Sequence, residues 1–127
     1  MMSHKFFPGK QAWYASDSPI TQFSAVFEDD GDTGYLYGYD RTNEAGILDA
    51  MQIYNVSSLA GGDRESVAEI IWTPDGLKAA LLINDFAHAI VNFADRSSSC
   101  RTGFPSAPHD WNRGAWAETL MDIFRRR

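Results

Sequence analysis

Four carboxylates fall within five positions of this sequence, at Glu28, Asp29, Asp30 and Asp32. Such a density of oxygen ligands could hold a hard cation such as Ca²⁺. The spacing fails the calcium loop of helix–loop–helix proteins, because Gly34 would take the fifth ligand position without a side-chain oxygen. We therefore predict no metal here, and expect a solvated turn whose negative charge forms a binding edge for a protein partner with a basic surface.

A thiol and an imidazole could form a nucleophile and its base, and the chain offers Cys100 with His88 or His109. That chemistry needs the two groups side by side, and the sequence does not show whether they meet. Phosphate-binding glycine loops, paired-cysteine zinc motifs and nucleophile elbows are absent from the sequence. We therefore assign no catalytic residue, expect no metal and no cofactor, and disfavour an enzyme without excluding one.

A second set of polar and aromatic side chains offers an alternative function. Arginine and tryptophan are favoured at binding sites, and a histidine can bind or transfer protons near neutral pH. If these side chains converge between a sheet and a helix, the protein is an enzyme or binds a small molecule. The residues of this alternative pocket are Asp85, His88, Arg101 and Trp111.

The first half of the chain must position the carboxylates on a hairpin. Apolar and aromatic residues alternate with polar ones over 23–28 and 35–40, which is typical of strands. The turn between them is rich in aspartate and glycine, which tolerate positive φ. Residues 47–56 fit either a strand or a helix, and we predict a strand that continues the meander.

Three aliphatic segments follow, at 67–72, 77–83 and 86–94, with short turns between them. If Ile83 faces Phe86, then Leu81 faces His88, which makes His88 a core histidine. A C-terminal helix capped by Asn112 would cover this apolar side. The opposite side is also apolar enough to need a cover, either the N-terminal arm or a second subunit in a homodimer. It comprises Ala80, Leu82, Ala87, Ala89 and Val91.

These elements predict an α+β fold, with a mainly antiparallel β-meander of five to six strands and a C-terminal helix packed on one face. We expect residues 1–127 to form a single domain in which residues 1–12 are an irregular arm. The chain has one cysteine and no run of 18 apolar residues, so we expect a cytoplasmic protein without a membrane span. Nucleic-acid binding is disfavoured because the basic residues cluster only at 125–127.

The negative charge is unevenly distributed along the chain. Of the formal net charge of −6, residues 11–63 contribute nine acidic side chains and one arginine, a net −8. Charge of one sign steers partners of the opposite sign. We therefore predict a non-catalytic binding or regulatory module, of which an immunity-type protein that blocks a toxin is one form, with the acidic edge as its binding site.

Several stretches also carry a resemblance to a known family, over most of residues 22–111. They include the turn and strand at 73–84, the segment Cys100–Pro105, the hairpin 27–35 and residues 47–50. In these the chain resembles a family of small bacterial proteins, domain of unknown function 2251. The resemblance implies a bacterial origin, and it assigns no activity and no catalytic residue.

Overall fold

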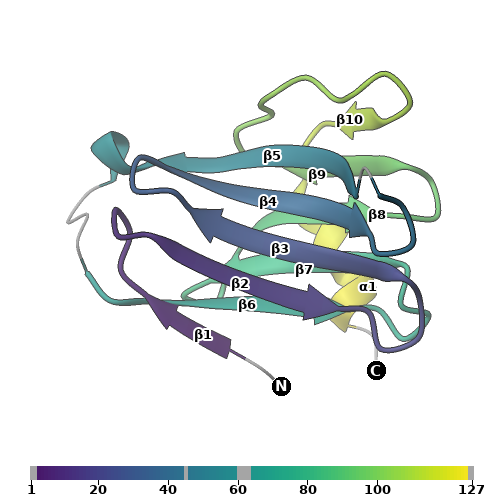
Figure 1. Cartoon of the computed structure of the whole chain (residues 1–127), viewed down its shortest axis with the longest axis horizontal. Coiled ribbons are helices and arrows are strands. Elements are labelled where there is room, and N and C mark those ends of the chain that lie inside the picture. The colour runs from purple at the N-terminus through teal and green to yellow at the C-terminus, as the bar shows by residue number, and fades with distance from the viewer. Residues whose placement is uncertain (1–2, 45, 60–63, 126–127) are drawn as a thin grey trace.

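The computed structural model describes residues 3–44, 46–59 and 64–125, and these form two antiparallel-rich β-sheets and a short C-terminal helical segment (Figure 1). One sheet has four strands in the order β2-β3-β4-β5, and the other has six in the order β1-β6-β7-β8-β9-β10. The four-stranded sheet comprises β2 (Ala12–Asp17), β3 (Phe23–Asp29), β4 (Thr33–Asp40) and β5 (Ile47–Asn55). The six-stranded sheet comprises β1 (Ser3–Phe6), β6 (Ser66–Trp72), β7 (Lys78–Ile83), β8 (Phe86–Asn92), β9 (Ser97–Cys100) and β10 (Asn112–Gly114).

The predicted strands are confirmed, whereas their arrangement in one sheet is wrong. The hairpin β3–β4, the strand β5 and the meander β6–β7–β8 all form where alternation and turn residues indicate them. They divide between two sheets because each half of the chain presents its own apolar face, and the two faces cover each other. A 3₁₀ turn, η1 (Val56–Ser58), follows β5 before the chain enters the second sheet.

The main core lies between the two sheets and explains why both form. Its fully buried members come from both layers, and aromatic rings meet across it: Phe23 stacks on Phe93 at 4.5 Å between ring centroids. Trp72 of β6 stacks on Phe93 at 5.9 Å and donates its indole N–H to Ser16 Oγ of β2 at 3.0 Å. The largest side chains with no exposed surface are Phe27, Leu36, Met51, Leu81 and Val91.

The N-terminal prediction is wrong for Ser3–Phe6 and Ala12, which belong to strands, while 7–11 form the turn between them. We expected an irregular arm over residues 1–12, but β1 pairs with β6 and β2 pairs with β3. Phe6 of β1 and Tyr14 of β2 are buried in the main core. Each of these two strands adds one strand to a sheet. Residues 1–2 of the arm and residues 126–127 of the basic cluster lie outside the described residues.

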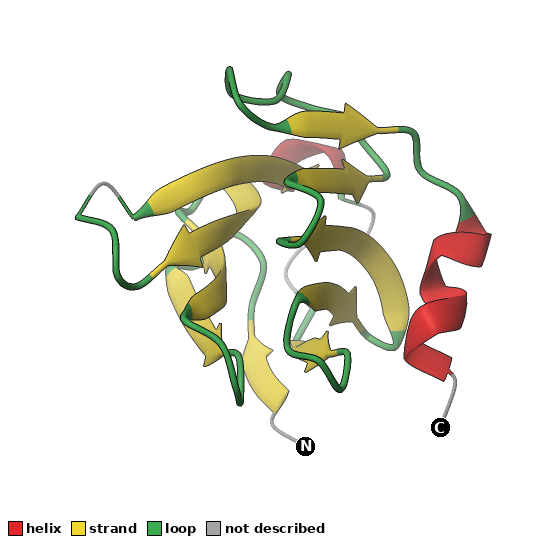
Figure 2. Cartoon of the chain, turned by 90° about the vertical axis from the view of Figure 1, so that its right-hand side faces the viewer, coloured by secondary structure: helices red, strands yellow, loops and turns green. Residues whose placement is uncertain are grey.

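The C-terminal segment covers the face of the six-stranded sheet that carries Ala80 and Ala87, whereas we expected a helix on the face that carries Leu81, which instead packs against the four-stranded sheet. The start of the predicted helix is wrong as well. Asn112 does not cap a helix, because Asn112–Gly114 form a strand that pairs in parallel with β9. Gly114 lies so close to β9 that a Cβ there would be 2.9 Å from Ser99 Oγ. The helical part is shorter, η2 (Glu118–Met121) and α1 (Asp122–Arg125). Figure 2 shows it on the side of the six-stranded sheet away from the four-stranded sheet. The apolar residues gathered there are Ala80, Ala87, Ile90, Met121 and Phe124.

One extra residue on β8 explains why the predicted pairing of Leu81 with His88 is wrong. Leu82 pairs with Ala87 and Leu81 pairs with Ala89, so His88 has no partner and forms a bulge. Beyond the bulge Ala89 and Val91 face the main core, and Ile90 faces the C-terminal segment. The face that prompted the homodimer expectation is thus divided between two contacts within this chain. No helix among the described residues is long and apolar enough to cross a membrane.

Candidate functional site

The outer face of the four-stranded sheet carries a row of aromatic side chains around one carboxylate. The register places Trp13, Glu28 and Tyr35 opposite one another on β2, β3 and β4. Tyr37 and Tyr39 continue the row along β4, with ring centroids 5.9 Å apart for Tyr35–Tyr37 and 6.4 Å for Tyr37–Tyr39. No described element lies over these strands in Figure 1. We call these five side chains the tyrosine face.

Glu28 is held in place at the centre of this face. Tyr37 Oη donates a hydrogen bond to Glu28 Oε1 at 2.9 Å, and both side chains are half-buried. Burial first, and then the bonded Glu28 carboxylate, raise the pKa of Tyr37 above its ordinary value. Tyr37 therefore remains a hydrogen-bond donor near neutral pH. Trp13 beside it is 62 % exposed, so its indole ring is accessible to solvent.

This arrangement has the chemistry of a cation site. The faces of tyrosine and tryptophan rings attract an ammonium or guanidinium group, and a carboxylate supplies the opposite charge. A planar guanidinium can stack on a ring and bond the carboxylate at the same time. The tyrosine face is therefore suited to an arginine or lysine side chain presented by another molecule.

The four predicted carboxylates do not share one environment. Asp30 and Asp32 are exposed in the β3–β4 turn, where Asp30 Oδ1 accepts the N–H groups of Asp32 and Thr33, both at 2.9 Å. These hydrogen bonds lower the pKa of Asp30. Glu28 lies on the tyrosine face. Three of the four carboxylates, Glu28, Asp30 and Asp32, therefore remain on the surface near the β3–β4 turn.

Asp29 departs from that expectation because it is buried with no exposed surface. Its Oδ2 accepts hydrogen bonds from Gly9 N at 2.9 Å and from Tyr54 Oη at 2.6 Å, and its Oδ1 accepts one from Gly31 N at 2.8 Å. Burial and this carboxylate raise the pKa of Tyr54. Asp29 thus joins the β1–β2 loop, the β3–β4 turn and β5, and its burial keeps it from a ligand in solvent.

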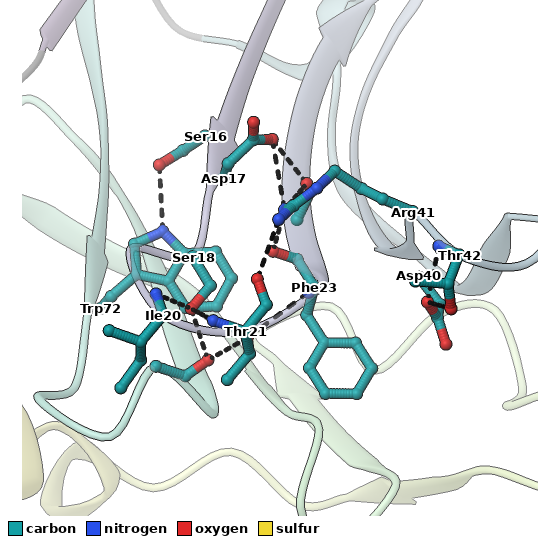
Figure 3. A network of polar contacts seen from close by, with 12 residues as sticks. Ser16, Asp17, Ser18, Ile20, Thr21, Phe23, Asp40, Arg41, Thr42 and Trp72 are labelled. Carbon is teal, nitrogen blue, oxygen red and sulfur yellow. Dashed lines mark hydrogen bonds and ion pairs between the residues drawn. The ribbon is translucent and has the colours of Figure 1, made fainter.

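A polar network lies at the end of the four-stranded sheet opposite the β3–β4 turn (Figure 3). Arg41 donates to the carbonyls of Phe23 at 2.7 Å and Thr21 at 2.8 Å, and it pairs with Asp17 at 3.5 Å. Ser18 Oγ donates to Gly76 O at 2.9 Å and so ties the β2–β3 loop to the β6–β7 turn. Arg41 is the one basic residue between positions 11 and 63, and these bonds occupy it.

The four residues predicted for an alternative pocket do not line one cavity, although two of them meet: Arg101 N donates to His88 O at 3.1 Å. Asp85 sits in the β7–β8 turn at a φ of 66°, and Trp111 is buried in the main core, where its indole N–H donates to Ser98 Oγ at 2.8 Å. Arg101 pairs with Glu118 at 2.7 Å and stacks on Phe86. Of the four, only His88 lines the larger cavity described below.

The space between the sheet and the helical segment is small. A cavity of about 110 Å³ lies there, lined in part by Lys78, Ile90, Ser98 and Leu120, and it contains none of the predicted pocket residues. Cys100 is buried, with its Sγ 3.5 Å from Thr102 Oγ1 and 3.8 Å from Phe104 O. No group of three potential metal ligands gathers within the part of the chain that the structure describes.

Sequence reasoning missed the tyrosine face, although its signal was present. The spacing of Tyr35, Tyr37 and Tyr39 places three tyrosines on one side of a strand. Nothing in the spacing tells which side faces the core. The structure answers this through the alternate residues, because Leu36 and Gly38 face the second sheet.

By architecture the protein is a two-layer β-sandwich, mostly β, with a helical segment on one outer face. The chain belongs to a family of uncharacterised proteins conserved in bacteria, domain of unknown function 2251, whose profile matches residues 6–125. This confirms the resemblance seen in the sequence.

One curated relative adds a sequence comparison without a function. It is an uncharacterised protein of Haemophilus influenzae, 44 % identical over 73 residues, which are 57 % of this chain. The matched segment covers 45 % of the relative, so the chain spans about half the length of the protein it matches. No solved structure matches this chain.

Proposed function

We propose that this protein is a non-catalytic binding module whose tyrosine face binds a basic surface of another protein. The observation that carries the proposal is the Glu28 carboxylate, bonded by Tyr37 and flanked by the rings of Trp13 and Tyr35. An arginine or lysine entering this face meets aromatic rings and a carboxylate together. Its guanidinium or ammonium group therefore gains two kinds of contact in one place.

The charge around the face supports the same kind of partner. Residues 11–63 carry a net charge of −8, and their one arginine is engaged with Asp17 and with backbone carbonyls. Asp30 and Asp32 extend the negative charge from Glu28 to the tip of the hairpin. Such a field speeds association with a basic surface and repels the phosphates of nucleic acids.

The test measures binding of a defined basic peptide by calorimetry at low salt and at physiological salt. The probe is a twelve-residue peptide of alternating arginine and glycine, compared with the same peptide carrying glutamate. We expect saturable binding of the arginine peptide and no binding of the glutamate peptide. The binding should weaken as salt rises, because salt screens the attraction between opposite charges. Binding of both peptides, or of neither, would contradict the proposal.

Matched variants separate the site from the overall charge. Glu28→Gln and Glu65→Gln remove the same charge, but Glu65 is an exposed residue outside the tyrosine face. We expect Glu28→Gln to weaken the arginine peptide roughly tenfold, about 1.4 kcal/mol, as for the loss of a charged hydrogen bond. Glu65→Gln should change it by less than about twofold. Equal effects of the two variants would show that only net charge matters.

An immunity-type protein is the narrowest form of this proposal, with a basic toxin as the partner. A charge-steered inhibitor of this kind needs a compact face with a fixed carboxylate, as Glu28 provides. The gene neighbourhood tests it directly. A toxin gene beside this one, whose purified product binds wild-type protein and not Glu28→Gln, would support this form, and a product that binds both equally would refute it.

A further inference from the structure

A cavity of about 380 Å³ opens at one end of the sandwich, outside the tyrosine face. It lies where β1, the end of β5 and the β7–β8 hairpin come together. Apolar side chains make most of its walls, which is typical of sites for small molecules, and the volume falls within the range of such sites. The apolar residues are Phe6, Pro8, Leu59, Ile83 and Phe86, and the ring of Tyr54 completes the wall.

The aromatic part of the wall is fixed by neighbouring contacts. The Arg101 guanidinium lies 3.9 Å from the centroid of the Phe86 ring, and Arg101 Nε donates to Ala87 O at 2.5 Å. Phe86 in turn meets the His88 ring edge to face at 5.4 Å. Phe86 nonetheless remains 53 % exposed. This half-exposed ring at the mouth of a cavity is a surface that an apolar ligand would cover.

Four polar residues line the same cavity, and two of them are already satisfied. Asn84 Oδ1 accepts Val67 N at 2.9 Å, and its Nδ2 donates to Ser66 Oγ at 3.4 Å. No hydrogen bond or ion pair to another described residue engages the side chains of Arg64 and His88. Burial first, and then the charge of Arg101, lower the pKa of His88 to about 4, so its imidazole is neutral and offers one N–H donor.

We propose that this cavity binds a small molecule with an apolar body and a single carboxylate, such as a medium-chain fatty acid or an aryl carboxylate. The apolar walls take the body, and Arg64 and His88 supply a cation and a donor for the carboxylate. An ammonium ligand would meet a cation at Arg64 and no carboxylate in the lining. The inference is independent of the tyrosine face, which lies on other strands.

The test uses octanoate, octanol and octylamine, which share the chain and differ in the head group, together with 4-phenylbutyrate as the aryl carboxylate. Binding is followed on the full chain by ¹⁵N and aromatic NMR shifts. We expect saturable shifts at Phe86 and His88, with octanoate at least about fivefold tighter than octanol and no binding of octylamine. The ratio of octanoate to 4-phenylbutyrate distinguishes the fatty from the aryl class.

Two variants keep the test decisive. Arg64→Gln should bring octanoate down to the affinity of octanol, whereas Arg96→Gln, which removes the same charge outside the cavity, should preserve the preference. Leu59→Trp fills the cavity from a half-exposed position, so binding should be lost while the chain stays folded. The proposal is overturned by equal binding of octanoate and octanol, by shifts outside the cavity, or by a Leu59→Trp variant that binds as well as wild type.

Discussion

The ion pair between Arg113 and Asp49 gives the sharpest prediction about stability. It connects β10 with β5, which are 64 positions apart, and Asp49 has no exposed side-chain surface. Arg113 Nη1 bonds Asp49 Oδ2, and Nη2 bonds Oδ1 at 3.0 Å. The same guanidinium donates to Pro105 O at 3.0 and 3.1 Å and to Ala50 O at 3.2 Å.

Replacing Arg113 by methionine keeps most of its volume and leaves Asp49 buried with its hydrogen bond from Ala50 N at 2.9 Å. Breaking one side of such a pair costs about 3–5 kcal/mol, because an uncompensated charge stays buried. A loss of this size is a large share of the roughly 5–15 kcal/mol that holds a domain folded. Urea unfolding followed by tryptophan fluorescence measures it.

The double variant Asp49→Leu/Arg113→Met is the control, since it removes both charges and keeps apolar volume. We expect it to be more stable than Arg113→Met alone by at least about 2 kcal/mol, because no charge is left unpaired. Contradiction would come from an Arg113→Met variant within about 1 kcal/mol of wild type, or from additive losses in the double variant.

Three further predictions concern the turn, the buried carboxylate and the bulge. Gly76→Ala should lower the free energy of unfolding in urea by about 1–3 kcal/mol more than Gly103→Ala does. Both glycines have φ near +70°, but a Cβ at Gly76 would lie 2.4 Å from the Ser18 hydroxyl, whereas Gly103 faces open space. Equal losses of stability in the two variants would refute the clash. Tyr54→Phe should lose about 1–3 kcal/mol, because Asp29 gives up a buried hydrogen bond, and a loss below about 0.5 kcal/mol would show that bond to be unimportant. The pKa of His88 is about 4 in the folded state against 6.5 ordinarily, so the unfolded chain binds more protons between these values. Stability should therefore fall by about 3 kcal/mol from His88 alone as the pH drops through that window. A His88→Gln variant that loses as much stability as wild type between pH 7 and pH 4.5 would contradict it.

Local chemistry made much of the fold predictable. The turn at 73–76 has a proline at its second position and Gly76, with a φ of +70°, at its fourth. Asn84 and Asp85 both adopt positive φ in a two-residue turn. These residues fix where strands end, which is why the hairpins appear at the expected positions.

The faces of the strands were less predictable, because they depend on contacts between distant residues. A single bulge at His88 puts Ile90 on the face opposite Leu81, with which we expected it to share a side, since a one-residue slip reverses every later side chain. The first strand escaped notice because β1 has four residues and its pairing partners lie 60 to 66 positions away. No local pattern records such a pairing.

The candidate site was predictable only in part, for the same reason. The density of carboxylates marked the acidic edge, but the burial of Asp29 depends on Gly9 and Tyr54, which reach it from other segments. The place of Glu28 among aromatic rings depends on strand order. The charge of the site could therefore be predicted from the sequence, and its geometry could not.

The most direct test of the binding proposal is to map where the arginine–glycine peptide contacts the protein by NMR titration at low salt. We predict that the largest chemical-shift changes fall on the Trp13 indole and on the tyrosines of β4. In Tyr37→Ala the peptide should cause no such changes, while the other signals keep the dispersion of a folded protein. Saturating shifts confined to the six-stranded sheet or the C-terminal segment, with Trp13 unchanged, would contradict the proposal.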